Sequence, residues 1–505
     1  MNPELRAKYE VVIGIECHVQ LATRSKLFCW CDNDSRDAEP NTHVCPICFG
    51  MPGTLPVLNK RAVELALRMG LALNAEFPDN LHTKFDRKNY FYPDSPKGYQ
   101  ITQFDEPIVP NGVVEFPLNG ELKRVGITRA HLEGDAGKLT HPDGKDYSLV
   151  DLNRAETPLL EIVSEPDMRS AAEAKGYAQE LHNLARYAGV SDANLYYGNM
   201  RFDVNVSVMK KGAKDFGTRT ETKNLNSFRY VERTVEYETR RQIAAVENGE
   251  RIRQETRGWN EAKGETYPMR SKEDADEYRY FPEPDLPPLV ITRAMVDEQR
   301  KELTYLPNDL RKKYREFGLQ EQQIEVLVSD DIRSRLYVSA LNTSKGQSAS
   351  DIANWLITDF PLVMADPLFL LDLTFIGREK SLASAIAQVF TLKREGKLSS
   401  SNVKALAREA ALILSKTKPS ERLTVASAPD FVAAIAKSEG LLQQSDTGEL
   451  GKIVDEVIAA NPQAVEDYKS GNHRAFGALV GQAMKATQGK GNPPVINQLL
   501  KDRLG

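Results

Sequence analysis

The sequence predicts an α+β protein in which an antiparallel sheet region precedes a helical region. Between about residues 10 and 290, apolar and polar residues alternate in short runs separated by Gly, Pro, Asn and Asp, which is typical of antiparallel strands. After about residue 295 the apolar spacing becomes helical and the aromatic strand-like runs disappear. The chain has 505 residues, too many for a single core, so we expect two to four domains.

The first expected strand, residues 11–21, reads VVIGIECHVQL and has two chemically different faces. At every second position one face is apolar, as a half-buried strand requires. The opposite face carries Glu16 and His18, whose carboxylate and imidazole project side by side because they lie two residues apart. Such a pair is placed to share one metal ion or one proton. For this strand taken alone, a solvent-facing pair on an ordinary sheet is the alternative interpretation.

Three later segments repeat this design. Burying a row of charged groups costs free energy unless the groups pair with one another or bind a ligand. Together with the first strand they therefore predict a polar cavity on a curved antiparallel sheet. The polar residues that share a strand face are Arg129, His131 and Glu133 in the first segment, Arg201, Asp203, Asn205 and Ser207 in the second, and Arg219, Glu221 and Lys223 in the third.

Helical spacing predicts helices at residues 59–73 and 171–187 within the sheet region. Asp351 is expected to cap a later helix, and residues 416–430, with two prolines and little periodicity, are expected to form a linker. The helices expected after residue 295 are 320–328, 330–341, 351–360, 381–395, 400–414, 431–436, 449–461, 473–486 and a last one that begins near Pro494.

All five cysteines lie between positions 17 and 48, and four of them form two close pairs, Cys29-x-Cys31 and Cys45-x-x-Cys48. This spacing is typical of four thiolates around a tetrahedral zinc ion, and four protein ligands leave no position open for a substrate. We therefore expect a structural zinc site. The alternatives are disulfides, which a reducing cytosol disfavours, and free thiols, which the spacing disfavours. Cys17 lies on the apolar strand face and is expected to be a buried structural thiol.

The net charge of −5 and the isoelectric point near 6.0 exclude a generally basic nucleic-acid-binding protein. Any RNA contact would use a local patch, and basic residues near the C-terminus lie beside the glycine-rich opening of the last helix, GKGNPP, whose free N–H groups suit a phosphate. A solvated surface helix explains this patch equally well. The sequence has neither a run of 18 apolar residues nor an apolar signal core, so we expect a cytoplasmic protein.

Several longer stretches are more specific than these patterns. Between residue 10 and the C-terminus, the chain closely resembles the B subunit family of the aspartyl/glutamyl-tRNA amidotransferases. The stretches that carry the resemblance are GIECHVQL, FDRKNYFYPDSPKGYQITQ from Phe85, VDLNRAETPLLEIVSEPD from Val150, ETKNLNSF from Glu221, DEYRYFPEPDLPPL from Asp276, and GALVGQAMKATQGKGNPPVINQLL in the tail.

The resemblance implies an enzyme that converts glutamate or aspartate misacylated on tRNA(Gln) or tRNA(Asn) into the amide. The B subunit would bind the charged tRNA and use ATP and Mg²⁺ to phosphorylate the side-chain carboxylate. An amidase, the A subunit, would release ammonia from glutamine, and a small third chain, the C subunit, would wrap the pair. The assembly would be a ligase that forms a carbon–nitrogen bond with glutamine as amide donor.

The resemblance also implies a fold with three parts. The first would be a cradle-shaped antiparallel sheet domain, residues 1–295, which carries catalysis and the zinc knuckle. A helical domain, residues 296–420, and a small all-α tail domain that binds tRNA, residues 425–505, would follow. The change from strand to helical patterns near 295 and the aperiodic segment 416–430 agree with that order.

Mapped residue by residue, the resemblance implies a magnesium site formed by Glu16, His18 and Glu133, with Asp203 as a further catalytic group. Hard oxygen ligands with a single histidine suit this ion. Two more acids in matching motifs are candidates for metal or substrate contacts, and three basic tail residues are expected to bind tRNA. These residues are Glu161 and Glu221, and Arg474, Lys485 and Lys490.

Two aromatic loops, RKNYFYPD and EYRYFPEPD, are expected to line the ATP or aminoacyl pocket, and a lysine or arginine there would steady phosphate charge. Packing of an aromatic, proline-containing loop is the alternative role for each member. The expected pocket residues are Lys88, Tyr90, Tyr92, Arg279 and Tyr280.

The chain departs from the family pattern at three positions. Gly134 stands where many relatives have a glutamate, so Glu133 would act without a neighbouring acid. Glu156 stands where the family usually has glycine, and Phe202 stands where relatives often have cysteine.

Two other functions compete with this interpretation. A non-catalytic tRNA-binding scaffold, whose metal only braces the sheet, would not need four polar strand faces to converge. A self-sufficient glutamine amidotransferase with Cys17 as nucleophile would need that thiol beside His18, whereas the alternation places it on the opposite face.

Overall fold

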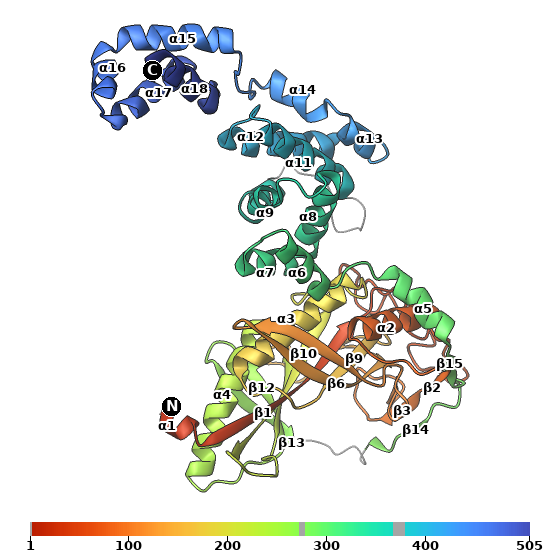
Figure 1. Cartoon of the computed structure of the whole chain (residues 1–505). Helices are drawn as coiled ribbons and strands as arrows, with labels where there is room; N and C mark the ends of the chain where they lie inside the picture. Colours follow the sequence, from red (N-terminus) through yellow and green to blue (C-terminus); the bar gives the residue numbers. More distant parts are fainter. Residues whose placement is uncertain (1–2, 272–277, 367–378) are drawn as a thin grey trace. The chain divides into compact units, whose positions relative to one another are not determined.

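The computed structural model describes residues 3–271, 278–366 and 379–505. The chain divides into two compact units, and the division falls between Leu310 and Arg311 (Figure 1). The first unit holds a large, mostly antiparallel sheet with helices, and the second is entirely helical in its described residues. The predicted α+β class, with a sheet region followed by a helical one, is confirmed. The finer division into three domains stays a prediction.

Eleven strands of the described residues form one sheet in the order β13-β12-β11-β10-β1-β9-β6-β4-β3-β14, with β5 paired to β6. Strands β11 and β12 run parallel, and the other described pairs of this sheet are antiparallel. Its strands are β1 Tyr9–Gln20, β3 Asp86–Asn89, β4 Tyr99–Thr102, β5 Gly112–Leu118, β6 Glu121–Gly134, β9 Pro158–Ser164, β10 Met200–Lys210, β11 Thr220–Leu225, β12 Glu255–Asn260, β13 Glu265–Ser271 and β14 Phe281–Pro282.

Strand β1 lies in the middle of this sheet, between β9 and β10. The side chains of its apolar face are buried in the core of the first unit, as the alternation predicts. Because this face must stay buried, the register of β1 against both neighbours is strongly specified. The polar face is thereby held on the opposite side of the sheet.

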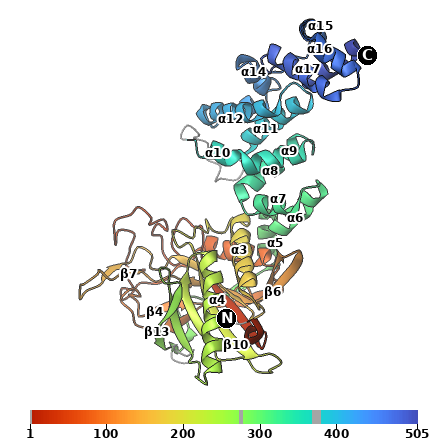
Figure 2. The same cartoon turned by 90° about the vertical axis from the view of Figure 1, so that its left-hand side faces the viewer.

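Helices cover the apolar face, and α3 and α4 lie side by side against it (Figures 1 and 2). The predicted helices 59–73 and 171–187 are confirmed as α2 and α3, with Asn59 and Ser170 as N-caps. The sequence pattern does not predict α4, because most of its core-facing residues are β-branched and therefore resemble strand residues. The helices of the first unit are α1 Pro3–Arg6, α2 Lys60–Ala72, α3 Ala171–Tyr187, α4 Phe228–Glu247 and α5 Arg293–Glu302.

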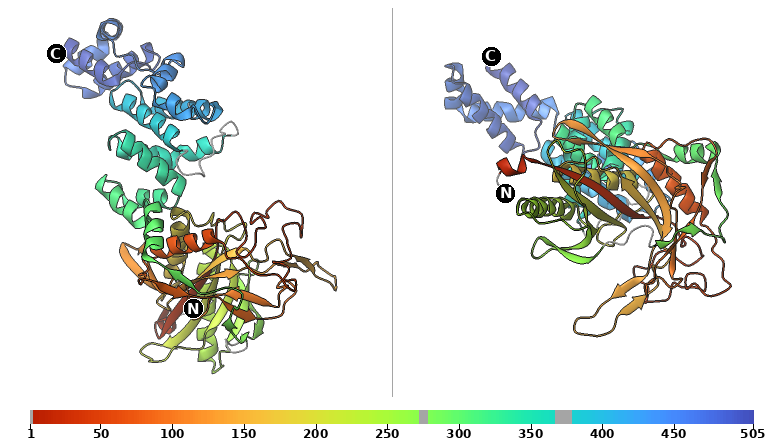
Figure 3. Two further views of the ribbon diagram at one scale, coloured as in Figure 1. Left: turned by 90° about the vertical axis from the view of Figure 1, so that its right-hand side faces the viewer. Right: turned by 90° about the horizontal axis from the view of Figure 1, so that it is seen from below.

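Two small two-stranded sheets accompany the large one. Strand β2, Leu81–Thr83, pairs with β15, Leu289–Ile291. Strand β7, Lys138–Thr140, pairs with β8, Leu149–Asp151, and this hairpin projects from the first unit (Figures 2 and 3). Helix α5 packs on α2, and the Arg68 guanidinium donates to Gln299 Oε1 at 2.9 Å. Contacts of the sheet unit therefore continue beyond residue 295.

The second unit contains the helices that follow the division, which falls inside α6. The bounds of these helices agree with most of the predicted helices. The helices are α6 Pro307–Glu316, α7 Glu321–Val328, α8 Asp331–Thr343, α9 Ala349–Thr358, α10 Phe360–Met364, α11 Glu379–Arg394, α12 Ser400–Lys416, α13 Arg422–Ser427, α14 Phe431–Ser438, α15 Thr447–Ala460, α16 Pro462–Lys469, α17 His473–Ala486 and α18 Pro493–Leu504.

Two details of the helical prediction are wrong. Asp351 does not cap a helix, because α9 begins two residues earlier and Asp351 instead accepts a hydrogen bond from Lys393 Nζ at 2.7 Å. The expected linker 416–430 contains α13, which packs on α11 and buries Ala426. Such a short helix gives too few apolar repeats for its periodicity to be recognised, whereas tertiary packing stabilises it.

Helices α15, α17 and α18 pack around a small core of their own, which includes Leu450, Leu479 and Leu500. Asn492 ties these helices to the preceding ones because its side-chain amide donates to Gly396 O at 3.0 Å. In the described part of the chain, no helix combines the length and the apolar character that crossing a membrane requires.

Candidate active site

The polar face of the sheet brings side chains from four neighbouring strands into two rows. His18 on β1 lies directly opposite Glu161 on β9, which in turn lies opposite His131 on β6. One step along β1, Glu16 lies directly opposite Asp203 on β10. Side chains of directly opposed residues contact each other across antiparallel strands. The pairing register therefore produces two adjacent clusters of ionisable groups.

His18, Glu133 and Glu161 form the first cluster, and their ligand atoms all lie within 4.8 Å of one another. His18 Nε2 lies 3.4 Å from Glu161 Oε2 and 3.6 Å from Glu133 Oε1. Burial disfavours the imidazolium, but Glu161, with Glu133 and Asp203, raises the pKa of His18 to about 9. Although burial opposes its charge too, His131 and His18 hold the pKa of Glu161 well below its usual range.

Glu16, Asp203 and Glu221 form the second cluster, again with ligand atoms within 4.8 Å of one another. The Asn205 side-chain amide donates to Glu16 Oε1 at 3.1 Å. Lys223 Nζ lies 3.1 Å from Asp203 Oδ2 and 3.7 Å from Glu221 Oε2. Despite burial, Lys223 lowers the pKa of Asp203, and the backbone N–H of Asn224 donates to the same carboxylate at 2.8 Å.

The structure distributes the predicted magnesium residues over both clusters. His18 and Glu133 lie in the first cluster with Glu161, whereas Glu16 lies in the second with Asp203. Carboxylate oxygens with at most one imidazole are the ligands that Mg²⁺ or Mn²⁺ accepts, so each donor set fits such an ion. In each cluster, the potential ligand atoms of three acidic or histidine side chains lie close together, and this convergence is what suits a metal ion.

Sequence reasoning did not assign site roles to three residues that contact these clusters: His131, Asn205 and Lys223. His131 Nε2 lies 3.7 Å from Glu161 Oε2, and the side chain is buried. Each of the three shares a strand face with a residue that was chosen, so the period-2 pattern contained their signal. Only the order of the strands in the sheet shows which of these polar residues become neighbours.

The two aromatic loops lie together, as the sequence predicts for one pocket. Lys88 Nζ lies 4.8 Å from the centre of the Tyr278 ring, and Tyr90 contacts both Tyr92 and Tyr278. Burial opposes the charge of Lys88, but Tyr280, Glu133 and Glu161 raise the pKa of its ammonium group. The positive charge of Lys88 therefore acts on the first cluster.

The other two predicted residues of these loops, Tyr280 and Arg279, have different surroundings. Tyr280 stacks on Phe104 with ring centres 4.1 Å apart. Arg279 is exposed, and its carbonyl oxygen accepts a hydrogen bond from the Asn89 side chain at 2.9 Å, which joins the two loops.

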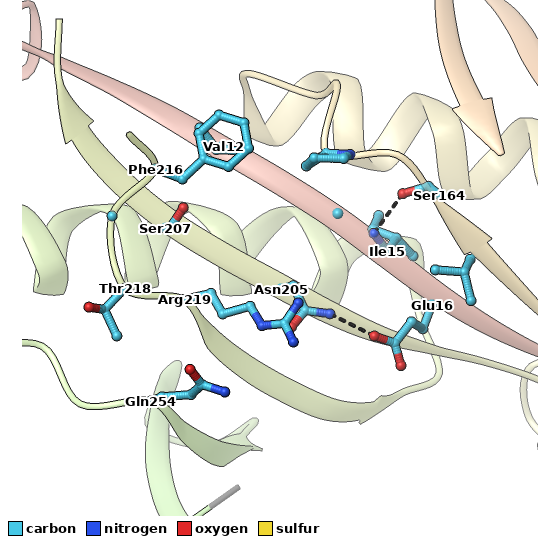
Figure 4. Close-up of a pocket in the computed structure, with 14 residues that line it drawn as sticks. Val12, Ile15, Glu16, Ser164, Asn205, Ser207, Phe216, Thr218, Arg219 and Gln254 are labelled. Carbon is cyan, nitrogen blue, oxygen red and sulfur yellow. Dashed lines mark hydrogen bonds between the residues drawn. The ribbon is translucent and has the colours of Figure 1, made fainter. Parts of the chain in front are cut away.

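A cavity of about 480 Å³ lies beside the second cluster (Figure 4). Glu16 lines one end, and Val12 and Phe216 line the other. Its volume is within the range of small-molecule sites in proteins.

Cys29, Cys31, Cys45 and Cys48 converge as their spacing predicts, and this group could hold a metal ion. The Cys48 sulfur lies 3.8 Å from that of Cys45 and 4.0 Å from that of Cys31. Sulfurs about 2.3 Å from a tetrahedral zinc ion would be about 3.8 Å apart, so these separations fit zinc.

Cys17 is fully buried on the apolar face of β1, and burial raises the pKa of its thiol well above the usual value. A buried neutral thiol is a poor nucleophile. The structure therefore disfavours the self-sufficient amidotransferase with Cys17 as nucleophile.

Gly134 and Glu156, two of the expected departures from the family pattern, are neighbours in space. A Cβ atom on Gly134 would lie 2.5 Å from Glu156 Oε2, so the Glu156 side chain occupies the space that a larger residue 134 would need. Glu156 has a φ of 66°, a backbone conformation that favours glycine. Glu156 Oε1 lies 2.9 Å from Lys97 Nζ, and both side chains are at most 9% exposed. A buried ion pair thus accompanies the strained backbone.

The tail residues expected to bind tRNA lie on or just after α17. Arg474, Lys485 and Lys490 are all exposed. At position 202, where relatives are expected to have cysteine, Phe202 on β10 is fully buried, and its ring centre lies 6.1 Å from that of Phe228 on α4.

Comparisons with known proteins cover nearly the whole chain. Residues 11–297 match the family "GatB/GatE catalytic domain", and residues 337–504 match the family "GatB domain". The chain is 44% identical to the B subunit of the aspartyl/glutamyl-tRNA(Asn/Gln) amidotransferase of Caldicellulosiruptor saccharolyticus over 98% of this chain and 99% of that protein. It is 45% identical to those of Carboxydothermus hydrogenoformans and Moorella thermoacetica, over 98% of this chain and 99% and 100% of theirs.

Exchanging the residues at positions 134 and 156 tests whether they form one unit. Gly134→Glu alone should destabilise the chain, because the new side chain meets Glu156, and Glu156→Gly alone should do so because Lys97 stays buried without its carboxylate, at a cost of about 3–5 kcal/mol. The double variant should be more stable than either single variant, since the carboxylate introduced at position 134 can enter the vacated space. Urea unfolding of all four proteins measures the coupling, and additive losses would contradict it.

Proposed function

This chain belongs to the B subunit family of the aspartyl/glutamyl-tRNA(Asn/Gln) amidotransferases, and we propose that it activates the side-chain carboxylate of a misacylated tRNA by ATP-dependent phosphorylation. The activated glutamate or aspartate is then amidated by ammonia to give Gln-tRNA(Gln) or Asn-tRNA(Asn). The convergence of two acidic clusters on one polar sheet face is the observation that supports this proposal most strongly.

Activation is needed because a carboxylate is a poor acyl donor, and ammonia cannot displace an oxide ion from it. Transfer of the γ-phosphoryl group of ATP to a carboxylate oxygen gives an acyl phosphate and ADP, and phosphate can then leave when ammonia attacks. Phosphoryl transfer depends mainly on positioning and on offsetting negative charge. The chain must therefore hold the ATP phosphates and the substrate carboxylate close together.

His18, Glu133 and Glu161 would hold one Mg²⁺ ion, and Glu16, Asp203 and Glu221 a second. Bound Mg²⁺ would supply positive charge that offsets the charge of the phosphates during transfer. Asn205 orients Glu16 by its amide hydrogen bond, and His131 contacts Glu161. These contacts preorganise the carboxylates on a rigid sheet, which is more precise than a loop.

Lys88 and Lys223 stand at the two clusters and would attract the anionic groups of the substrates. Lys88 lies among the tyrosines of the aromatic loops, where unpaired bases of an RNA end can stack. The 3′ end of the charged tRNA would therefore approach the first cluster over Tyr90 and Tyr280. The exposed basic residues of the tail would bind the tRNA body.

The relatives are named as the B subunit of their enzyme, which implies an assembly of several chains. We infer that a separate amidase chain, the A subunit, releases ammonia from glutamine and that a small third chain, the C subunit, completes a heterotrimer. Cytoplasmic translation would supply the charged tRNA. The four-cysteine cluster would hold a structural Zn²⁺ ion, since four thiolates leave no position open for substrate.

Carboxylate-to-amide substitutions test the acidic clusters in the complex with its A and C subunits. Glu161→Gln and Glu16→Gln should each lower ATP turnover with charged tRNA by about 100-fold or more, because each removes a charged ligand. The control Glu115→Gln, in the β5 edge strand, makes the same change away from the site.

ATP hydrolysis is measured with glutamyl-tRNA(Gln), with aspartyl-tRNA(Asn) and with both tRNAs uncharged. Turnover that requires a charged tRNA supports carboxylate activation. If tRNA binds to the wild-type complex but no ATP is hydrolysed, the non-catalytic scaffold is the better interpretation. Wild-type turnover in the Glu161→Gln variant would contradict the metal-binding role assigned to that cluster.

Charge reversal in the tail tests tRNA binding. A triple substitution of Arg474, Lys485 and Lys490 by glutamate should weaken tRNA affinity by about tenfold or more and flatten its salt dependence, because phosphate contacts are lost. Turnover at saturating tRNA should stay close to that of the wild type. Lys452→Glu on α15 is the exposed control in the same region. An unchanged affinity of the triple variant would count against a tRNA-binding tail.

Removal of zinc should cost stability rather than chemistry. Cys45→Ser, or chelation of the metal, is expected to lower the melting temperature of the complex, because three remaining thiolates hold zinc poorly. Cys17→Ser, which changes a thiol that is not a metal ligand, is the matched control for metal content. Metal content is measured beside melting and kcat, and a lower kcat with unchanged melting would contradict a structural role.

A further inference from the structure

A buried network of ion pairs lies on the helix-covered side of the sheet, behind the second cluster. Its centre is Glu238 on α4, whose side chain is fully buried. Helix α4 contacts β10 and β11, the strands that supply Asp203 and Glu221 to the cluster (Figure 2). Resting on the proposed function, we infer that Glu238 is a positioning residue, which holds Glu221 in place for the metal ion of the second cluster.

Strand β11 needs such support because its backbone pairing is sparse. In the described residues, its parallel pairing with β12 covers only two residue pairs, Glu221 with Thr256 and Thr222 with Arg257. Its antiparallel pairing with β10 is interrupted by a shift of register between Thr222 and Leu225. Parallel pairs are slightly less stable than antiparallel ones. Contacts from behind the sheet must therefore help to fix the position of β11.

Glu238 binds β11 at the residue that precedes Glu221. The Thr220 hydroxyl donates to Glu238 Oε2 at 2.7 Å. The side-chain amide of Gln242 joins the same place to β10, because it donates to Thr220 Oγ1 at 2.9 Å and to Val206 O at 3.0 Å. Successive side chains of a strand point to opposite faces. Holding Thr220 on the helix side therefore determines where Glu221 points on the polar side.

Glu238 also holds the next strand, β12. Arg257 Nε lies 3.2 Å from Glu238 Oε1, and the Thr266 hydroxyl on β13 donates to the same oxygen. On the polar side, the residue before Arg257 is Thr256, whose hydroxyl donates to Glu221 Oε2 at 3.1 Å. One carboxylate behind the sheet thus aligns two strands whose polar-side residues contact each other at the cluster.

The charges of this network are paired without help from the cluster. Arg241 donates to both oxygens of Glu238, at 2.9 and 2.7 Å, and Arg257 also pairs with Glu255. Burial disfavours the carboxylate, but the hydrogen bonds and charge of Arg241 hold the pKa of Glu238 below its usual value. Satisfied buried polar groups rigidify their surroundings, which is what a positioning role requires.

Stabilisation of the fold alone is the rival role, and substitutions of Thr220 separate the two. Thr220→Val removes the hydroxyl, suits a strand and leaves the ion pairs of Glu238 in place. Thr220→Ser keeps the hydroxyl and should restore the wild-type behaviour. Thr222→Val is the matched control, because Thr222 lies two residues further on the same strand face and its buried hydroxyl has no hydrogen-bond partner among the described residues.

Mn²⁺ binding is measured by titration calorimetry in the complex with its A and C subunits, in two backgrounds that each leave one cluster intact. In the Glu161→Gln background the second cluster is intact, and Thr220→Val should weaken Mn²⁺ affinity about tenfold, because Glu221 loses its fixed orientation. In the Glu16→Gln background the first cluster is intact, and the same substitution should leave the affinity unchanged. Thr220→Ser and Thr222→Val should bind Mn²⁺ as tightly as their background does.

The other outcomes are decisive as well. Unchanged Mn²⁺ affinity of Thr220→Val in the Glu161→Gln background would overturn the inference, and so would equal weakening in both backgrounds, which indicates a general loss of structure. Thr220→Ala removes the same hydroxyl and takes the place of Thr220→Val if that variant does not assemble. If the Glu161→Gln complex bound no Mn²⁺ while the wild-type complex turned over ATP with charged tRNA, this inference would fail and carboxylate activation would stand.

Discussion

Burial of the apolar face of β1 is the constraint on which the rest of the site depends. Because successive side chains of a strand alternate between faces, a slip of one residue would move Glu16 and His18 into the core and expose Ile13, Ile15 and Val19. The free energy of burying these side chains thereby fixes which residues of β9 and β10 stand opposite the polar ones. Helices α3 and α4 complete this core and leave the other face for chemistry.

The charged groups on the polar face offset one another, besides being potential metal ligands. Six carboxylate or imidazole groups of the two clusters lie close together, and each desolvated charge would be costly without a partner. Lys223 beside Asp203, and Lys88 beside the first cluster, offset part of that negative charge. The same arrangement that makes the clusters attractive to a cation therefore also makes them tolerable without one.

Positions 134 and 156, where the sequence departs from the expected family pattern, are filled by the side chain of a single residue. The carboxylate of Glu156 occupies the space next to Gly134 and pairs with the buried Lys97. The cost is a non-glycine residue with φ of 66°, in a region where L-residues are strained. Only the tertiary structure shows that these two positions are neighbours, so the sequence could not indicate that they depend on each other.

The sequence by itself determined the α+β class, the four polar strand faces, the four-cysteine group and most helices, because these depend on spacing of two or 3.6 residues along the chain. It missed several helices, among them α4 and α13, where β-branched residues or short length weakened the periodic signal. Only the tertiary structure decided that Glu161 joins His18 and Glu133 while Glu16 joins Asp203 and Glu221, and that Gly14 borders a cavity. The physical reason is that these groupings arise from strand order and cross-strand register, which no local pattern encodes.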